Sequence, residues 1–225
     1  MTTPGAPYRD RTEAGQRVAD ALESYHGQTT TVLGLPRGGV PIAAVIADRL
    51  AAPLDILVVR KVGAPGNAEF GLGAVAEGPV RYLSHTSLRE WGIRPDELES
   101  DVRRQEEEVE RLARRLRGGR SFPDLQNRVV ILVDDGMATG GTVRAAIEAV
   151  RLHRPSRVVV AVGVSSREAI RALRPLVDEV VSPIVPPVLF AVGEWYRDFP
   201  PVSEAEVMAL LQRHWTEPSS LAVAR

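Results

Sequence analysis

The chain has 225 residues, with 28 basic and 29 acidic side chains and no cysteine. The lack of cysteine excludes a disulfide framework, a cysteine-ligated metal and a thiol nucleophile. A net charge near zero gives no reason to expect a nucleic-acid partner, and no apolar run approaches the roughly 20 residues of a membrane span. The N-terminus has no apolar signal core. We therefore expect a cytoplasmic protein without a membrane partner, built as a single α/β domain over residues 1–225.

The first predicted elements are a helix and a strand. Residues 10–25 are typical of an amphipathic helix. Its apolar face carries Ala14, Val18, Ala21 and Leu22. Residues 29–35 (TTTVLGL) form the first buried strand, and residues 40–50 form the helix that follows it.

The loop between that strand and helix reads Pro-Arg-Gly-Gly over residues 36–39. Glycine lets a backbone approach a ligand closely, and Arg37 supplies a planar, permanently charged donor fork. Backbone N–H groups and one guanidinium suit a diphosphate. The alternative is an ordinary turn with an exposed arginine.

The next predicted strand, residues 54–59, ends in Arg60 and Lys61, and Lys61 is the only lysine of the chain. The glycine-rich residues 61–78 are either a mobile lid over a site or a β-hairpin. A short strand over 80–83 and a short helix over 86–91 follow. Residues 95–117 are a long exposed helix with many charge pairs, which we interpret as a packing arm or dimer contact. Its apolar seam is Leu98, Val102, Val109, Leu112 and Leu116.

The central motif is a buried strand over residues 129–133, followed by Asp134, Asp135 and then Ala-Thr-Gly-Gly-Thr over residues 138–142. The helix over 143–152 begins there, and unsatisfied N–H groups at a helix start suit a phosphate monoester. The two carboxylates would repel that phosphate, so they should face neutral hydroxyl groups or a metal ion. A ribose 5-phosphate meets both requirements.

The rest of the chain completes the sheet and covers its end. Strands over 157–164 and 179–181, with a helix over 167–173 between them, give an open parallel sheet of four or five strands flanked by helices. Residues 184–225 form a C-terminal hood, with a capped helix from Ser203 whose Glu206 completes a capping box. Trp195 and Tyr196 either stack on a base or close the core.

The strand, the acid pair and the Thr-Gly-Gly-Thr loop resemble the phosphoribosyl diphosphate (PRPP) motif of the type I phosphoribosyltransferases. The segment Arg-Lys-Val-Gly-Ala-Pro-Gly-Asn over residues 60–67 is similar to that of a bacterial group of predicted members. The resemblance implies a fold with a core over about 29–185 and a lid and insertion over about 61–127. It also implies that catalysis depends on Mg²⁺ and that the protein forms a homodimer.

The resemblance also implies site residues. Ribose would be held by Asp134 and Asp135, which are also the possible protein ligands of a Mg²⁺ held mainly by PRPP. The 5-phosphate would be held by Ala138, Thr139, Gly140, Gly141 and Thr142. The diphosphate would be held by Pro36, Arg37, Gly38, Gly39 and Lys61. Catalytic side chains would be Arg37, Arg60 and Lys61, with Glu69 and Asn67 as weaker candidates from the lid. The base would be held by Val185, Trp195 and Tyr196.

The expected reaction is transfer of the phosphoribosyl group from PRPP to a nitrogen of a nucleobase. Ala138 stands where the 6-oxopurine enzymes carry an aspartate, and no lysine follows Lys61, so hypoxanthine and guanine are disfavoured. The uracil enzymes' C-terminal pattern is not apparent either. One alternative is a regulator that senses PRPP or a nucleotide without turnover, and another is a hydrolase or phosphorylase that uses the same pocket.

Overall fold

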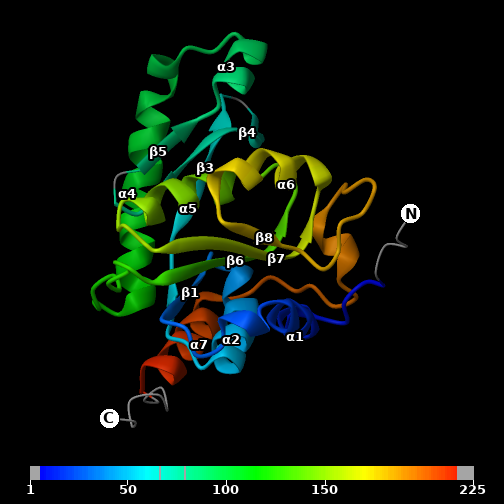
Figure 1. Ribbon diagram of the computed structural model, residues 1–225. Helices are drawn as coiled ribbons and strands as arrows, with labels where there is room; N and C mark the ends of the chain where they lie inside the picture. The colour runs from blue at the N-terminus through cyan, green and yellow to red at the C-terminus, as the bar shows by residue number, and fades with distance from the viewer. Residues whose placement is uncertain (1–5, 66, 79, 217–225) are drawn as a thin grey trace.

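The computed structural model describes residues 6–65, 67–78 and 80–216, and the side chains of all of these except 67–70. Its centre is a five-stranded parallel sheet in the order β2-β1-β6-β7-β8 (Figure 1). These strands are β1 (Thr30–Gly34), β2 (Leu54–Ile56), β6 (Val129–Met137), β7 (Arg157–Ser165) and β8 (Glu179–Val181). The predicted open parallel sheet of an α/β fold is confirmed.

Helices cover both faces of this sheet (Figure 1). On one face lie α1 (Arg11–Ala21), α2 (Gly39–Leu50) and α7 (Glu204–Thr216), and on the other lie α5 (Gly141–Arg151) and α6 (Arg167–Leu173). Each face of the sheet packs in its own hydrophobic core, and alternate residues of a strand point into one core or the other. Ile131 and Val133 belong to the first core, and Val130 and Leu132 belong to the second. Apolar side chains on both sides explain why these strands read as continuous runs. Within the described residues, no helix is long and apolar enough to cross a membrane.

The glycine-rich segment is a hairpin, the second of the two alternatives. Strands β3 (Val59–Ala64), β4 (Asn67–Ala76) and β5 (Val80–Leu83) form an antiparallel sheet that rises beside the main one (Figure 1). Residues 54–59, predicted as one strand, are divided between the two sheets. The chain leaves the main sheet at Val58, whose N–H donates to the Glu77 carboxylate at 2.8 Å instead of to a neighbouring strand.

Beyond this small sheet lie α3 (His85–Trp91) and the long α4 (Glu99–Arg117). The apolar seam predicted for α4 is confirmed, because Leu98, Val102, Val109 and Leu116 are buried and Leu112 packs against the same core. Short 3₁₀ helices complete the chain: Glu23–Tyr25, Pro95–Leu98, Arg174–Leu176 and Val192–Trp195.

The N-terminal helix differs in one detail from the sequence prediction. Ala14, Val18 and Leu22 are buried as expected, but Ala21 is exposed. The buried face of the helix is formed by Ala14, Gly15, Val18 and Ala19. At about 100° per residue, Ala21 lies at the edge of that face. The predicted Ser203 cap of α7 is present, with the Glu206 N–H donating to its hydroxyl at 3.1 Å.

A buried ion cluster attaches the end of α4 to both sheets. The Arg117 side chain is only 5% exposed and pairs with Asp55 at 2.8 Å and with Glu77. It also donates to the Ile56 carbonyl at 2.5 Å. Burial raises the pKa of Asp55, and the Arg117 charge opposes that shift. The cluster therefore depends on Arg117, because its removal would leave the buried Asp55 and the partly buried Glu77 carboxylates without their shared cation.

Replacing Arg117 by methionine should lower the free energy of unfolding by about 3–5 kcal/mol, since it leaves uncompensated buried charge. Urea unfolding measures the change. Arg104→Met is the matched control on the same helix, because Arg104 is exposed and pairs only at the surface with Asp101; it should change stability by about 0.5 kcal/mol or less. Equal losses of stability in Arg117→Met and Arg104→Met would contradict the stabilising role assigned to the buried Arg117 cluster.

Candidate active site

The two glycine loops meet at one edge of the main sheet. Strands β1 and β6 are neighbours in register, with Gly34 opposite Val133, so the loop after β1 lies against the end of β6. A Cβ atom added to Gly38 would lie 1.9 Å from Asp135 Oδ2, and one added to Gly39 would lie 2.3 Å from the Val133 carbonyl oxygen. Only glycine permits this approach. The peptide bond between Pro36 and Arg37 is cis.

Strand β6 is longer than predicted and includes the acid pair. Pairing with β7 continues beyond Val133 to Met137, with Asp134 opposite Val162. Successive side chains of a strand point to opposite faces, so the two carboxylates diverge. The Asp134 Oδ1 accepts a hydrogen bond from the Asp135 N–H at 2.9 Å.

Asp135 is paired with an arginine that the sequence did not single out. Arg11 Nε and Nη2 donate to Asp135 Oδ2 at 3.1 and 3.0 Å, and the two side chains are 11% and 17% exposed. A third donor of Arg11 reaches the Pro200 carbonyl at 2.9 Å, and the guanidinium lies 3.8 Å from the centre of the Phe199 ring. Asp134 forms no ion pair with another described residue, so the two carboxylates differ in that only Asp135 has a cationic partner there.

Burial raises the pKa of both carboxyl groups. At Asp134 the charge of Asp135 raises the pKa further, whereas at Asp135 the Arg11 guanidinium opposes the shift. The pair is therefore electrostatically asymmetric, with one acid held by a cation and the other destabilised by burial and by its neighbour.

The Thr-Gly-Gly-Thr loop forms one wall of a pocket of about 140 Å³. Gly140 adopts a left-handed conformation with a φ of 79° and is the N-cap residue directly before α5. Thr139, Gly141 and Thr142 line the pocket together with Lys61 from β3. The same pocket is also lined by three further residues that carry hydroxyl groups, Tyr82, Ser84 and Ser87. Hydroxyls, a helix start and one ammonium group suit a phosphate monoester.

Arg60 and Lys61, predicted to act on the same diphosphate, are separated. Lys61 shares the pocket with Thr139 and Thr142, whereas Arg60 lines a different cavity with Pro36 and Arg37. Neighbouring residues of β3 face opposite sides of the hairpin sheet, which explains the separation. Lys61 was predicted to bind the diphosphate together with Pro36 and Arg37, but the structure places Lys61 in a different cavity from those two residues. The side chains of Asn67 and Glu69 lie outside the described residues, so their roles stay predictions.

The hood places Tyr196 in the core. Its side chain is 5% exposed, its ring lies between Tyr8 and Phe199, and its hydroxyl donates to the Asp135 carbonyl at 2.6 Å. Stacking of a base on Tyr196 is therefore wrong, and the core-closing alternative holds. Trp195 and Val185 are half-buried, and their contact with a base stays a prediction.

Asp134→Asn tests the electrostatics of the buried pair. The pKa of Asp134 is raised in the folded chain. Above about pH 4 this carboxyl is ionised in the unfolded chain but still protonated in the folded one, so folding requires the uptake of a proton. The free energy of unfolding therefore falls as the pH rises, until the folded carboxyl also ionises. Asparagine keeps the Oδ1 acceptor and removes the charge. Urea unfolding should find the variant about 1 kcal/mol or more stabler at pH 8, with no difference near pH 4.

The exposed Asp124→Asn is the matched control for this pH dependence and should show no gain at pH 8. A lower stability of Asp134→Asn than of the unaltered chain at pH 8 would contradict the predicted repulsion at this carboxyl.

Known proteins and a family model match most of the length of this chain. A family model described as phosphoribosyl transferase domain matches residues 9–196. The Mycobacterium tuberculosis H37Rv protein named "Putative phosphoribosyl transferase Rv0571c" is 41% identical over 206 residues, covering 92% of this chain and 46% of that protein. The chain thus spans about half the length of this curated relative.

Two further relatives match a larger share of their own length. The adenine phosphoribosyltransferase of Mycobacterium marinum is 29% identical over 182 residues, which cover 76% of this chain and 80% of that protein. The crystal structure of TT1426 from Thermus thermophilus is 44% identical, with a TM-score of 0.78, and the match covers 92% of this chain and 98% of that one. With most of its length matched by the family model, this chain belongs to the phosphoribosyl transferase domain family.

Proposed function

We propose that the protein transfers the 5-phosphoribosyl group of PRPP to a nitrogen of a nucleobase and releases diphosphate. The observation that carries the proposal is the convergence of two glycine loops and the adjacent acid pair, Asp134 and Asp135, at a single sheet edge. Gly38 and Gly39 lie against the end of β6, and the pocket of Thr139 and Thr142 follows that strand directly.

Each part of PRPP has a matching group in this arrangement. The 5-phosphate fits the hydroxyl-lined pocket, where Lys61 adds a positive charge. The ribose hydroxyls fit Asp134, since Asp135 is held by Arg11. The diphosphate fits the N–H groups of Arg37 and Gly38, with the Arg37 guanidinium beside them, whereas the Gly39 N–H donates to the Leu35 carbonyl at 3.0 Å.

In the proposed reaction, the bond between ribose C1 and the diphosphate oxygen breaks, and the acceptor nitrogen forms a bond to the same carbon. The bonding electrons leave with the diphosphate, and the proton lost by the acceptor nitrogen passes to diphosphate or solvent. The protein supplies position and charge, because fixed cationic groups stabilise the negative charge that develops on the leaving group.

Mg²⁺ is the expected cofactor. The described residues hold no cluster of three or more His, Cys, Asp or Glu side chains able to bind a metal ion, but Mg²⁺ commonly uses one or two carboxylates together with phosphate oxygens and water. Asp134 fits that limited role, and the ion would neutralise part of the diphosphate charge. The homodimer and the cytoplasmic location also stay predictions.

Adenine is the first acceptor to test. Ala138 and the absence of any lysine after Lys61 disfavour hypoxanthine and guanine. The Mycobacterium marinum relative is named an adenine phosphoribosyltransferase, which supports the same choice. Its identity of 29% leaves the acceptor open to a panel of nucleobases and small amines.

The experiment is diphosphate release from PRPP with Mg²⁺ and each acceptor in turn. We expect release that depends on one nucleobase, and a loss of about 100-fold or more in kcat/KM for Asp134→Asn, since oriented contacts that position a substrate are worth several kcal/mol. Asp124→Asn should retain the activity. PRPP binding without turnover for any acceptor would contradict the transferase and favour the sensing alternative. Release of ribose phosphates with no base present would favour the hydrolase.

A further inference from the structure

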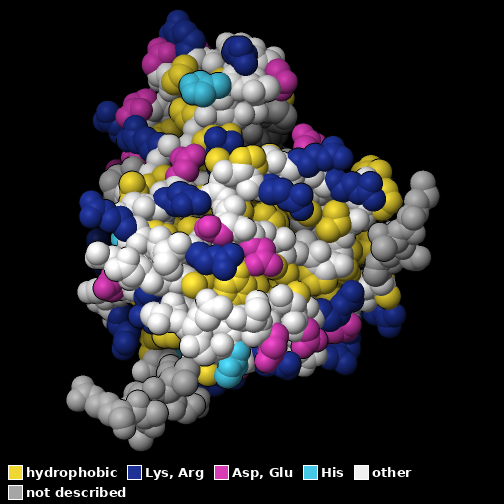
Figure 2. Space-filling model, in the orientation of Figure 1, with side chains coloured by type: hydrophobic (Ala, Val, Ile, Leu, Met, Phe, Trp, Pro, Cys, Tyr) yellow, Lys and Arg dark blue, Asp and Glu magenta, His cyan; other side chains and the backbone are white. Residues whose placement is uncertain are grey.

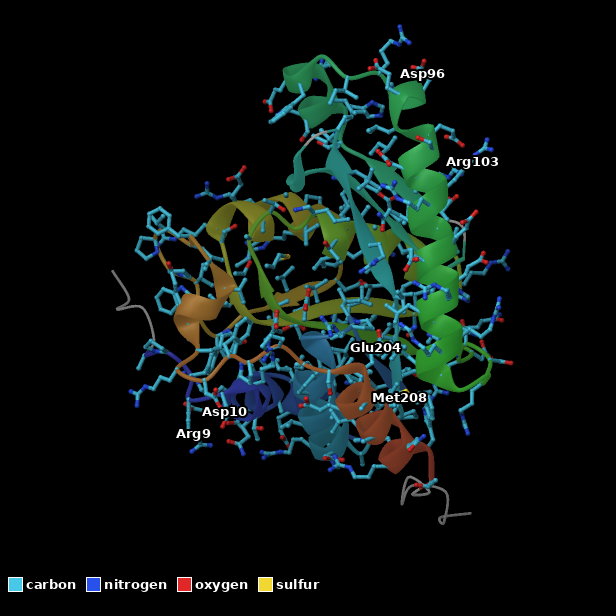
Figure 3. The ribbon with its side chains drawn as sticks, turned by 180° about the vertical axis from the view of Figure 1, so that it is seen from behind. Arg9, Asp10, Asp96, Arg103, Glu204 and Met208 are labelled. Carbon is cyan, nitrogen blue, oxygen red and sulfur yellow. The ribbon has the colours of Figure 1, made fainter. Side chains whose placement is uncertain are left out.

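A second cavity, of about 330 Å³, lies between α4, the start of β3 and the loop at Pro36 and Arg37. Six charged side chains line it. They are Arg37, Arg60, Glu108, Arg111, Arg115 and Glu204. Three of them come from α4, the long helix that the sequence indicated only as a packing arm, and Glu204 comes from the first turn of α7. In Figure 3, Glu204 lies at the start of α7 beside the lower half of α4.

Positive charge exceeds negative charge in this cavity. Glu108 accepts from Arg111 at 2.5 Å and lies 3.9 Å from Arg60, and Glu204 accepts from Arg115 at 2.6 Å. Two carboxylates therefore face four guanidinium groups. Arg60, Arg111 and Arg115 are about half exposed, so each ion pair contributes little to stability, and their donors stay accessible to a ligand from solvent.

The position of Arg111 and Arg115 on α4 is specific. Glu108, Arg111 and Arg115 are three and four residues apart, so they share one face of the helix. Arg103 and Arg114 do not line the cavity. Arg114 lines a separate cavity with Glu110 and Arg117, and Arg103 pairs with Glu99 at 2.9 Å. The face that carries the excess positive charge is the one turned toward Arg37.

The chemistry of the lining selects the class of ligand. Guanidinium groups present paired donors that match phosphate oxygens in a bidentate way. Several such groups in one cavity favour an anion with more than one charge and several oxygens. Arg37 directly precedes the glycines that lie against the end of β6, so the cavity borders the loop to which the proposed function assigns the diphosphate.

We propose that this cavity binds a diphosphate group, and that α4 contributes Arg111 and Arg115 to that binding. The proposal deepens the proposed function and rests on it where the diphosphate belongs to PRPP. Binding of free diphosphate, the product of the reaction, is a property of the cavity alone. The long helix would then be a part of the site that binds the leaving group as well as a packing element.

The test is isothermal titration calorimetry of the full chain with inorganic diphosphate and Mg²⁺. Arg111→Gln/Arg115→Gln should weaken diphosphate binding about tenfold or more, because hydrogen bonds to charged groups are lost. Arg103→Gln/Arg114→Gln removes the same charge from the same helix outside the cavity and should change the dissociation constant by less than about twofold. Each single variant, Arg111→Gln or Arg115→Gln, should give part of the loss.

Diphosphate binding that is equal in the two double variants would overturn the proposal. A PRPP transfer assay separates this failure from failure of the proposed function. Transfer with an unchanged KM for PRPP in Arg111→Gln/Arg115→Gln would overturn the role of α4 and leave the transferase in place. Diphosphate binding that depends on Arg111 and Arg115 in a chain inactive with every acceptor would support the cavity and count against the transferase.

Discussion

The site depends on one steric constraint, the contact between the loop after β1 and the end of β6. Gly38 and Gly39 leave no room for a side chain there, because an added Cβ atom would meet Asp135 or the Val133 carbonyl. The parallel pairing of β1 with β6 sets this distance, so the sheet positions the two loops. Any larger residue at these glycines would push apart the groups that we assign to the two ends of one ligand.

A second constraint is electrostatic and ties the ends of the chain to the centre. Arg11 from α1 holds Asp135, and its other contacts are Phe199 and the Pro200 carbonyl in the hood. Tyr196 adds a hydrogen bond to the Asp135 backbone. The N-terminal helix and the hood thus both position the Asp135 carboxylate. Asp134 is not paired with any described cation, and burial together with the charge of Asp135 raises its pKa, which is typical of groups at functional sites.

Figure 2 shows Lys and Arg side chains interspersed with Asp and Glu over the face in view, with no extended area of one sign. The local excess of positive charge lies instead in the cavity of Arg37, Arg60, Arg111 and Arg115.

The local sequence was sufficient to predict the strands of the main sheet and the two glycine loops. The strand over 129–133 could be recognised because apolar, β-branched runs are typical of strands buried on both faces. The glycine pairs could be placed because each follows such a strand. Arg11 could not be found in this way, because its partner lies 124 positions away and arginine is common in this chain.

Features that depend on packing between distant segments were also beyond local patterns. The continuation of β6 through Asp134 and Asp135 follows from its pairing with β7. The separation of Arg60 from Lys61 follows once that segment is a strand, because adjacent side chains then face opposite ways. Tyr196 was left between two roles, and only the positions of Tyr8 and Phe199 decide between them.

The most direct test of the central claim is phosphorus-31 NMR of PRPP titrated with the protein and Mg²⁺ in the absence of an acceptor. If the two loops hold opposite ends of one ligand, the 5-phosphate resonance and both diphosphate resonances should shift or broaden together, with one apparent dissociation constant. Perturbation of only one end of PRPP, or of neither, would contradict a single site built from both loops.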